Sequence, residues 1–125
     1  MSLRFFYCNF CGKLFSLCDE GIKTKTICCN SDMKELIPNT TEGAHEKHIP
    51  VIKQDGHNVT IKIGEDPHPM LDEHFIEWIK LVTNEGVYTK YLLPNTNPLA
   101  SFILQKNETP VKAYAYCNIH GLWST

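Results

Sequence analysis

Six cysteines in a chain of 125 residues constrain what this protein can fold into more than any other feature. Five of them fall within the first 29 residues, whereas the sixth and four of the six histidines lie beyond residue 50. A chain of this length accommodates one ordinary domain, or a small metal-stapled module followed by a domain of under about 90 residues. The uneven distribution of metal-ligating side chains predicts two separate metal-binding regions.

The N-terminal cysteines have a spacing typical of one metal site. Cys8 and Cys11 form a C-x2-C pair, and the adjacent Cys28 and Cys29 follow after sixteen residues, so four thiolates are available for a tetrahedral ion. A segment of about 36 residues buries too little apolar surface to fold alone, so a bound metal would supply the missing folding free energy. Gly12 suits the tight turn that directs both sulfurs of the first pair at one ion.

The adjacent pair Cys28-Cys29 differs from an ordinary zinc ribbon, in which the last two ligands come from a second C-x2-C motif. Neighbouring sulfurs should distort the tetrahedron, and iron tolerates such a site as an electron-transfer centre. Two alternatives are a structural zinc ion and a disulfide between Cys28 and Cys29, although a reducing compartment disfavours the disulfide. Cys18 is left over, and we expect it to be a packed or free thiol rather than a ligand.

The rest of the chain has the pattern of an antiparallel β-domain. The segment from Pro38 to Ala44 is polar or small apart from the proline, so residues 37–44 are predicted to be a linker. Beyond it, Asn58–Ile63 alternates polar and apolar residues, as a strand with one buried face does. Further β-rich segments, separated by turn residues, run over Val87–Leu93, Ser101–Gln105 and Val111–Cys117. Such spacing predicts a β-sandwich over residues 45–125, preceded by a metal module over residues 1–36.

One segment fits two interpretations. Phe75, Trp78, Ile79 and Val82 have the i, i+3, i+4, i+7 spacing of an amphipathic helix. Aromatic and β-branched residues nevertheless crowd this stretch, which runs through Glu85-Gly86 into another β-rich segment. We therefore expect a strand.

A second group of donors is spread along the C-terminal domain. It comprises four histidines and the sixth cysteine, namely His48, His68, His74, Cys117 and His120. This is one donor more than zinc usually takes, and mixed imidazole and thiolate ligation suits iron or copper. Five protein ligands leave an octahedral metal one open position. If the four imidazoles lie in a plane, the thiolate is axial and donates electron density toward whatever binds opposite it, as in thiolate-ligated haem.

Charge and hydropathy exclude several classes of function. Twelve basic and 14 acidic side chains give a net charge of −2, and no stretch concentrates Lys or Arg as a nucleic-acid surface would. The longest apolar run, Ala113–Cys117, is far shorter than the roughly 20 residues of a membrane-spanning helix. The N-terminal apolar run ends at Asn9, too early for a signal peptide. We expect a cytoplasmic protein, in which cysteines serve as ligands rather than disulfides.

Several motifs together resemble the signature of one family, the desulfoferrodoxins, which are two-iron superoxide reductases. In chain order they are Glu46-Lys47-His48-Ile49-Pro50-Val51-Ile52, His68-Pro69-Met70 with His74 six residues after His68, Trp78-Ile79, and Tyr116-Cys117-Asn118-Ile119-His120-Gly121. The resemblance covers nearly the whole chain. Two features depart from it: the gap between Cys11 and Cys28 is one residue longer than usual, and Cys18 is not a ligand in the family.

The resemblance implies an all-β fold with two iron ions. A desulforedoxin-like module would hold one iron on Cys8, Cys11, Cys28 and Cys29. An immunoglobulin-like or fibronectin-like antiparallel sandwich would hold the other, with His48, His68, His74 and His120 in the plane and Cys117 on the axis. Glu46 and Lys47 would stand over the vacant face as catalytic residues.

The implied reaction is the one-electron reduction of superoxide to hydrogen peroxide, with electrons from an external, rubredoxin-like donor. Lys47 would attract the anionic substrate, and Glu46 would occupy the open position after the product leaves. The resemblance also favours a homodimer. Two other classes of function stay open: a zinc-binding structural or interaction module, and a rubredoxin-type electron carrier. The five-donor set opposes the carrier, because electron transfer alone needs no open coordination position.

Overall fold

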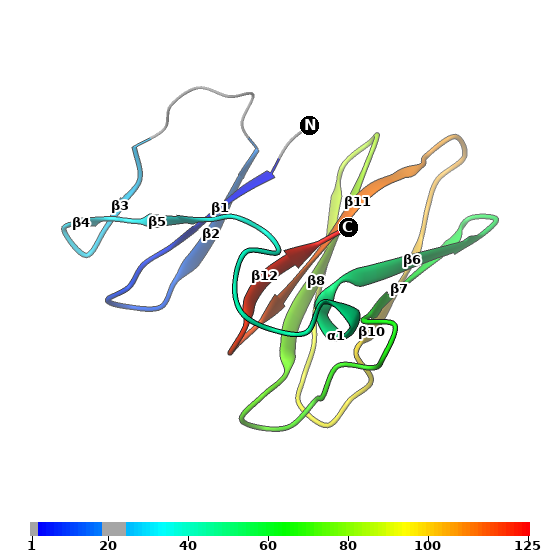
Figure 1. The fold of residues 1–125 in the computed structure, drawn as a ribbon. Coiled ribbons are helices and arrows are strands. Elements are labelled where there is room, and N and C mark those ends of the chain that lie inside the picture. Colours follow the sequence, from blue (N-terminus) through cyan, green and yellow to red (C-terminus); the bar gives the residue numbers. More distant parts are fainter. Residues whose placement is uncertain (1–2, 19–24) are drawn as a thin grey trace. The chain divides into compact units, whose positions relative to one another are not determined.

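A computed structural model describes residues 3–18 and 25–125 of the chain. It divides into two compact units, Met1–Ile37 and Pro38–Thr125. Apart from one helical turn, the regular elements of the described residues are all strands, so the predicted all-β class is confirmed (Figure 1). Among the described residues, no helix has the length and apolar character needed to cross a membrane.

The N-terminal unit consists of a small sheet and a short hairpin. The sheet has the antiparallel order β2-β1-β5, formed by β1 (Leu3–Tyr7), β2 (Leu14–Cys18) and β5 (Lys34–Leu36). The hairpin pairs β3 (Ile27–Cys28) with β4 (Ser31–Asp32). Among the described residues of this unit, few large side chains are buried, chiefly Phe5 and Phe6 of β1. This small core agrees with a unit that depends on a bound metal.

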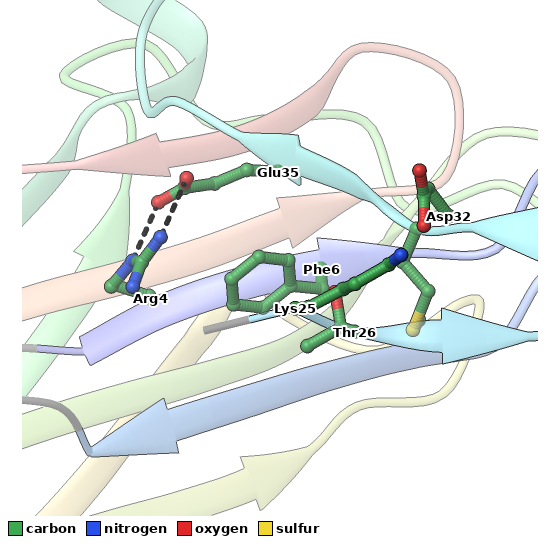
Figure 2. A pocket seen from close by; sticks show the side chains of 7 residues that line it. Arg4, Phe6, Lys25, Thr26, Asp32 and Glu35 are labelled. Carbon is green, nitrogen blue, oxygen red and sulfur yellow. Dashed lines mark hydrogen bonds and ion pairs between the residues drawn. The ribbon is translucent and has the colours of Figure 1, made fainter. Parts of the chain in front are cut away.

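A two-pronged ion pair joins β1 to β5 in this unit. Arg4 Nε and Nη2 donate to the two carboxylate oxygens of Glu35 over 2.9 and 3.0 Å. The same guanidinium lies 5.1 Å from the centre of the Phe6 ring. Figure 2 shows the pair beside an open cavity of about 410 Å³, which is also lined by Lys25 and Asp32.

The C-terminal unit is an antiparallel β-sandwich, as the sequence predicted (Figure 1). One sheet has the order β10-β7-β6 and contains β6 (Pro50–Asp55), β7 (Asn58–Ile63) and β10 (Leu99–Ile103). The other has the order β12-β11-β8-β9 and contains β8 (Ile76–Thr83), β9 (Val87–Tyr91), β11 (Pro110–Cys117) and β12 (Gly121–Ser124).

Large and small side chains complement each other in the sandwich core. The alternation in β7 places Val59, Ile61 and Ile63 in the core with no exposed surface, and β7 has the predicted bounds. Ala113 and Ala115 of β11 belong to the same core, where their small side chains make room for these branched ones. The turn before β7 contains Gly56, whose φ of +60° is easily adopted by glycine.

The segment with helical spacing is strand β8, as expected. It is a central strand between β11 and β9, and its two faces are both buried, which removes the simple alternation of a half-exposed strand. Ile79 and Leu81 belong to the core. Trp78 stacks on Tyr116 of β11, with 5.8 Å between the ring centroids and 13° between the ring planes. A register shift between Tyr116 and Cys117 further disturbs the period.

A single helical turn, α1 (His45–His48), precedes β6. The chain after β7 forms two backbone hydrogen bonds with this region. Gly64 N donates to Ile49 O over 3.1 Å, and Asp66 N donates to Glu46 O over 3.1 Å. Gly64 has a φ of +82°, and a Cβ there would lie 2.6 Å from Lys47 O. Glycine at 64 therefore allows the backbone to approach α1 and fixes the turn that carries His48.

Candidate metal centres

Four cysteines of the N-terminal unit gather around one point. Cys8 and Cys11 come from the turn after β1, and Cys28 and Cys29 come from the β3–β4 hairpin; their sulfurs lie within 4.8 Å of one another. The Sγ atoms of Cys11 and Cys28 are 3.6 Å apart, and those of Cys28 and Cys29 are 3.9 Å apart. A tetrahedral metal with metal–sulfur bonds of about 2.3 Å separates its sulfurs by about 3.8 Å. The cluster thus fits one tetrahedral ion.

Local backbone conformations explain how these cysteines converge. Gly12 has a φ of +75°, and its N–H donates to Cys8 O over 2.9 Å, which forms the predicted tight turn. Cys29 and Asn30 both have positive φ, so the chain reverses sharply at the adjacent pair. The 3.9 Å between the sulfurs of Cys28 and Cys29 rules out a disulfide in this structure, because a bonded pair lies about 2.05 Å apart.

The remaining thiol of this unit stays outside the cluster. Cys18 is a free, exposed cysteine at the end of β2, and it does not belong to either donor group. This agrees with the expectation that it is not a ligand. The unusually long gap between Cys11 and Cys28 includes residues 19–24, which lie outside the described residues.

Three thiols of the cluster, Cys8, Cys28 and Cys29, have shifted pKa values. Backbone N–H groups, above all that of Cys11, lower the pKa of Cys8 to about 6. Hydrogen bonds with neighbouring sulfurs, first that of Cys8, raise the pKa of Cys28 to about 12. The pKa of Cys29 is raised for the same kind of reason. The Cys8 thiolate therefore forms easily at neutral pH, whereas a bound cation would be needed to ionise Cys28 and Cys29.

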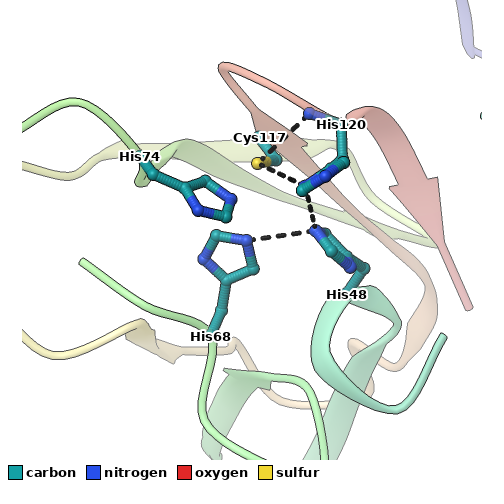
Figure 3. Close-up of side chains that lie close together, drawn as sticks. All are labelled: His48, His68, His74, Cys117 and His120. Atoms are coloured by element: carbon teal, nitrogen blue, oxygen red, sulfur yellow. Dashed lines mark hydrogen bonds between the residues drawn. The ribbon is translucent and has the colours of Figure 1, made fainter. Parts of the chain in front are cut away.

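The second cluster contains His48, His68, His74, Cys117 and His120, whose donor atoms also lie within 4.8 Å of one another (Figure 3). Contacts between neighbouring imidazole rings close a cycle in the order 48, 68, 74, 120. The successive distances between ring centroids are 4.6, 4.8, 5.0 and 4.8 Å, and neighbouring planes are inclined by 66–84°. Such a cycle has the shape of the predicted equatorial plane.

Hydrogen bonds at the far ring nitrogens assign two of the ligand atoms. His48 Nδ1 lies 2.7 Å from Ala44 O, and His68 Nδ1 lies 2.6 Å from Pro69 O. Each Nδ1 therefore carries the proton, and each Nε2 presents a lone pair. The two Nε2 atoms nevertheless lie 3.1 Å apart, and His48 Nε2 lies 3.1 Å from His120 Nδ1.

Lone pairs facing each other at this distance repel unless a cation lies between them. A metal with bonds of about 2.1 Å places neighbouring nitrogens about 3.0 Å apart, close to the observed separations. His74 Nε2 supports the same conclusion, because it is buried and has no hydrogen-bond partner. The donor set thus fits a metal bound by Nε2 of three histidines, Nδ1 of His120 and the sulfur of Cys117.

Burial keeps the imidazoles ready to bind. It lowers the pKa of His68 to about 4, and it also lowers the pKa values of His48 and His74. These rings are therefore neutral at pH 7, as metal ligands must be. Burial raises the pKa of the Cys117 thiol, although the N–H groups of His120 and Ile119 oppose this effect. A bound metal would ionise it.

The cluster has a buried side and a side nearer the solvent. Cys117 ends the buried strand β11 and has no exposed surface, and His48 and His68 are also buried. His74 and His120 are half-buried. The sulfur therefore approaches from the protein interior.

Glu46 and Lys47 stand apart from the donor cluster. Both are exposed residues of α1, directly before the ligand His48, and neither belongs to the group of converging donor atoms. Glu46 lines a cavity of about 450 Å³, together with His45 and Glu65. The nine predicted ligands are thus brought together in two clusters, and these two predicted catalytic residues lie at the surface beside the second.

Sequence reasoning missed several residues that support the ligands. Trp123, fully buried in β12, stacks on the His48 ring with 4.6 Å between centroids and 23° between planes. Asn118 accepts from Phe75 N and donates to Glu73 O, both over 3.0 Å, and so holds the backbone on either side of His74. Their positions close to Cys117 and His120 in the sequence were the available signal.

Comparisons with known proteins agree with this architecture. The family model for desulfoferrodoxin matches residues 40–125. The desulfoferrodoxin of Desulfarculus baarsii is 39% identical over 121 residues, which cover 97% of this chain and 94% of that protein. A desulfoferrodoxin homolog from Methanothermobacter thermautotrophicus is 38% identical over 120 residues, which cover 96% of this chain and 95% of that protein.

Solved structures extend the similarity to three dimensions. The superoxide reductase from Treponema pallidum matches with a TM-score of 0.86 and 34% identity, covering 100% of this chain and 99% of that one. A superoxide reductase from Giardia intestinalis matches with a TM-score of 0.54 and 35% identity, and the match covers 64% of this chain and 95% of that one. With the two clusters described above, these matches show that the chain belongs to the desulfoferrodoxin family, with one iron site of four cysteines and one of four histidines and a cysteine.

Proposed function

We propose that this protein is a superoxide reductase. In the proposed reaction superoxide takes up one electron and two protons to give hydrogen peroxide, and no dioxygen is formed. The observation that carries the proposal is the five-donor cluster, because five protein ligands would leave a six-coordinate iron one position for a small substrate. The names of two structural neighbours, from Treponema pallidum and Giardia intestinalis, support it.

The protein's task at this site is to set the electronic character of the metal. A ferrous iron supplies the single electron when bound, and an external donor restores it. Cys117 provides a thiolate from the buried side, and the N–H of His120 lies 3.4 Å from its sulfur. Such hydrogen bonds tune how strongly a thiolate donates electron density.

Lys47 is the proposed steering residue. Its exposed side chain follows Glu46 in α1 and immediately precedes the ligand His48. A lysine about 7 Å from a monovalent anion, in an effective dielectric of about 20, attracts it by about 2 kcal/mol. This raises the local concentration of superoxide, and salt weakens the effect. Water organised near this ammonium group is the proposed source of protons.

Glu46 is the proposed occupant of the open position when substrate is absent. It is an exposed carboxylate two residues before His48, and its backbone is fixed by the hydrogen bond from Asp66 N. Its side chain lines the cavity shared with Glu65, so this role requires a movement of the Glu46 side chain. An altered ferric spectrum in Glu46→Ala, with a near-normal first encounter with superoxide, would support the role.

The remaining assignments concern partners and location. We propose a rubredoxin-like protein as the electron donor and a homodimer as the assembled form. The cysteine iron site would relay electrons or stabilise its unit. Five thiolate ligands need a reducing environment, so a cytoplasmic location is proposed.

The decisive experiment measures peroxide and dioxygen separately while the iron-loaded protein consumes superoxide in the presence of an electron donor. A superoxide reductase yields peroxide without dioxygen. Dioxygen in equal amount to peroxide would identify a dismutase instead. Metal analysis tests the zinc alternative, since two zinc ions per chain would give a colourless protein without this activity.

A further inference from the structure

A short segment before α1 packs along β12 and reaches the second metal site. Asn39 anchors it: its side chain donates to Ser124 O over 3.1 Å and accepts from Ser124 N over 2.9 Å, and its own N–H donates to Leu122 O over 3.0 Å. Asn39 also has a φ of +64°, which asparagine tolerates better than most residues. Residues 39–43, here called the strap, are thus held in place although their composition predicted a linker.

The strap contacts His120 through a hydroxyl group. Thr41 Oγ1 donates a hydrogen bond to His120 O, and the Trp123 indole N–H donates to the same oxygen over 3.1 Å. Two donors therefore fix the carbonyl of one ligand residue. The N–H of that residue lies 3.4 Å from Cys117 Sγ, so its backbone also sets a contact of the thiolate.

His120 needs such support more than His48 and His68 do. His48 and His68 each fix their ring through an Nδ1–H bond to a backbone carbonyl. His120 cannot do so, because its Nδ1 is the atom that faces the other donors. Nδ1 is also closer to the backbone than Nε2, so any shift of the His120 backbone is passed almost directly to the ligand atom.

The end of the strap closes over two ligand rings. A Cβ at Gly43 would lie 3.1 Å from His48 Cε1, 3.2 Å from Trp123 Cζ2 and 3.3 Å from His120 Cγ. The φ of Gly43 is +148°. A side chain here would push the rings apart by a few tenths of an ångström, although the residue itself is exposed.

We propose that the strap positions the His4Cys metal site, with Thr41 fixing the His120 backbone and Gly43 allowing close packing against the His48 and His120 rings. The strap holds two of the four histidine ligands, and through His120 it adjusts the hydrogen bond to the Cys117 thiolate. This inference goes beyond the proposed function, because it concerns the metal site whatever the substrate is.

The first test replaces the Thr41 hydroxyl with a methyl group of similar size. In iron-loaded Thr41→Val we expect the thiolate-to-iron absorption band to shift and a chelator to remove the second-site metal about tenfold faster, the size typical for loss of a group that orients a ligand. Thr41→Ser retains the hydroxyl and should restore both values. Thr60→Val is the matched control, because Thr60 Oγ1 pairs with Ser101 Oγ on the other sheet.

The second test compares two glycines with positive φ. Gly43→Ala should shift the same band, because the rings must move. Gly56→Ala should lower only the melting temperature, since a Cβ there meets no atom within 4 Å. Thermal unfolding of the metal-free proteins reports general destabilisation, which would not by itself move the absorption band.

An unchanged band and an unchanged rate of metal loss in Thr41→Val would overturn the positioning role. A band that shifts equally in Thr60→Val would overturn it too, since the effect would then be unspecific. If Gly43→Ala does not fold, the Thr41 series carries the test alone. A wild-type protein that fails to reduce superoxide would refute the proposed function, yet would leave these spectroscopic comparisons intact.

Discussion

The N-terminal unit places its four clustered cysteines in a turn and a short hairpin, with Cys11 and Cys29 exposed, whereas the C-terminal unit places the buried Cys117 at the end of a strand of the sandwich. The first unit has a core of a few side chains such as Phe5 and Phe6, and the second has two sheets packed over branched and aromatic residues. From this difference we expect the metal to have different structural tasks in the two units. It should hold the fold together in the first, and in the second it should be bound by a fold that is already stable.

Removal of both metals should give the largest difference between the units. Metal binding to small cysteine sites contributes about 10–16 kcal/mol, more than such a small core supplies, so the N-terminal unit should unfold. The sandwich should keep its structure. Hydrogen exchange, followed by mass spectrometry with and without a chelator, measures both units in one sample. Protection that persists in β1, or is lost throughout β7 and β11, would show that the two units do not differ in their dependence on metal.

Substitution of one buried ligand should abolish function in the second unit without unfolding it. In Cys117→Ser we expect loss of the thiolate-to-iron absorption band of that site and loss of superoxide reduction. The absorption of the cysteine site should remain. Cys11→Ser is the matched variant, and it should remove the first absorption and leave the second. A Cys117→Ser protein that kept its band would exclude Cys117 as a ligand.

The turn that carries His48 depends on a glycine in the chain after β7. Gly64→Ala would bring a Cβ to 2.4 Å from Asp66 O and 2.6 Å from Lys47 O, at a φ of +82°. We expect the free energy of unfolding of the sandwich to fall by about 3 kcal/mol, and α1 to shift. Chemical denaturation measures the loss. Gly86→Ala, which meets no atom within 4 Å, should cost far less.

Loss of the proposed steering charge should have a moderate effect on rate. Lys47→Ala should slow superoxide consumption several-fold and flatten its dependence on ionic strength, while iron content stays the same. Pulse radiolysis at several salt concentrations measures both quantities. Lys53→Ala, an exposed lysine of β6, is the control. Equal salt dependence in wild type and Lys47→Ala would contradict the steering role.

The smallest expected effect concerns the metal-independent stability of the sandwich. Glu108 is buried and accepts hydrogen bonds from Thr83 Oγ1 at 2.7 Å, Gln105 N at 2.9 Å and the Tyr88 hydroxyl at 2.9 Å. These bonds, above all the one from Thr83, lower the pKa of Glu108 below its ordinary value of 4.5. The ionised Glu108 therefore contributes its full stabilisation of the fold above about pH 4.5. This contribution is lost as the pH falls through the lower pKa of the folded state.

Glu108→Gln should remove this part of the pH dependence. Thermal unfolding of the metal-free protein from about pH 7 to about pH 3 shows the change as a smaller drop in melting temperature on acidification. Glu85→Gln, in the exposed turn between β8 and β9, should retain the wild-type dependence. Parallel curves for wild type and Glu108→Gln would show that other groups control acid unfolding.

The metal-ligand groups and strand β7 could be predicted from the sequence, because the spacing of the donors and the polar–apolar alternation are patterns within the sequence itself. The ring cycle at the second site was not, since it depends on loops that bring His48, His68 and His120 together across two sheets. The bounds of β8 also needed tertiary context, because burial on both faces hides the strand period. The role of the strap was missed because its polar residues form specific hydrogen bonds that composition does not reveal.

The proposed function depends on four histidines and one cysteine that hold one iron and leave one position for substrate. Iron X-ray absorption on reduced Cys11→Ser, in which we expect the cysteine site to be empty, measures this iron alone. We expect a shell of four nitrogen neighbours and one sulfur, and a spectrum that changes when a small anion such as azide is added after oxidation. A shell with more than one sulfur, or one that is saturated and indifferent to azide, would contradict it.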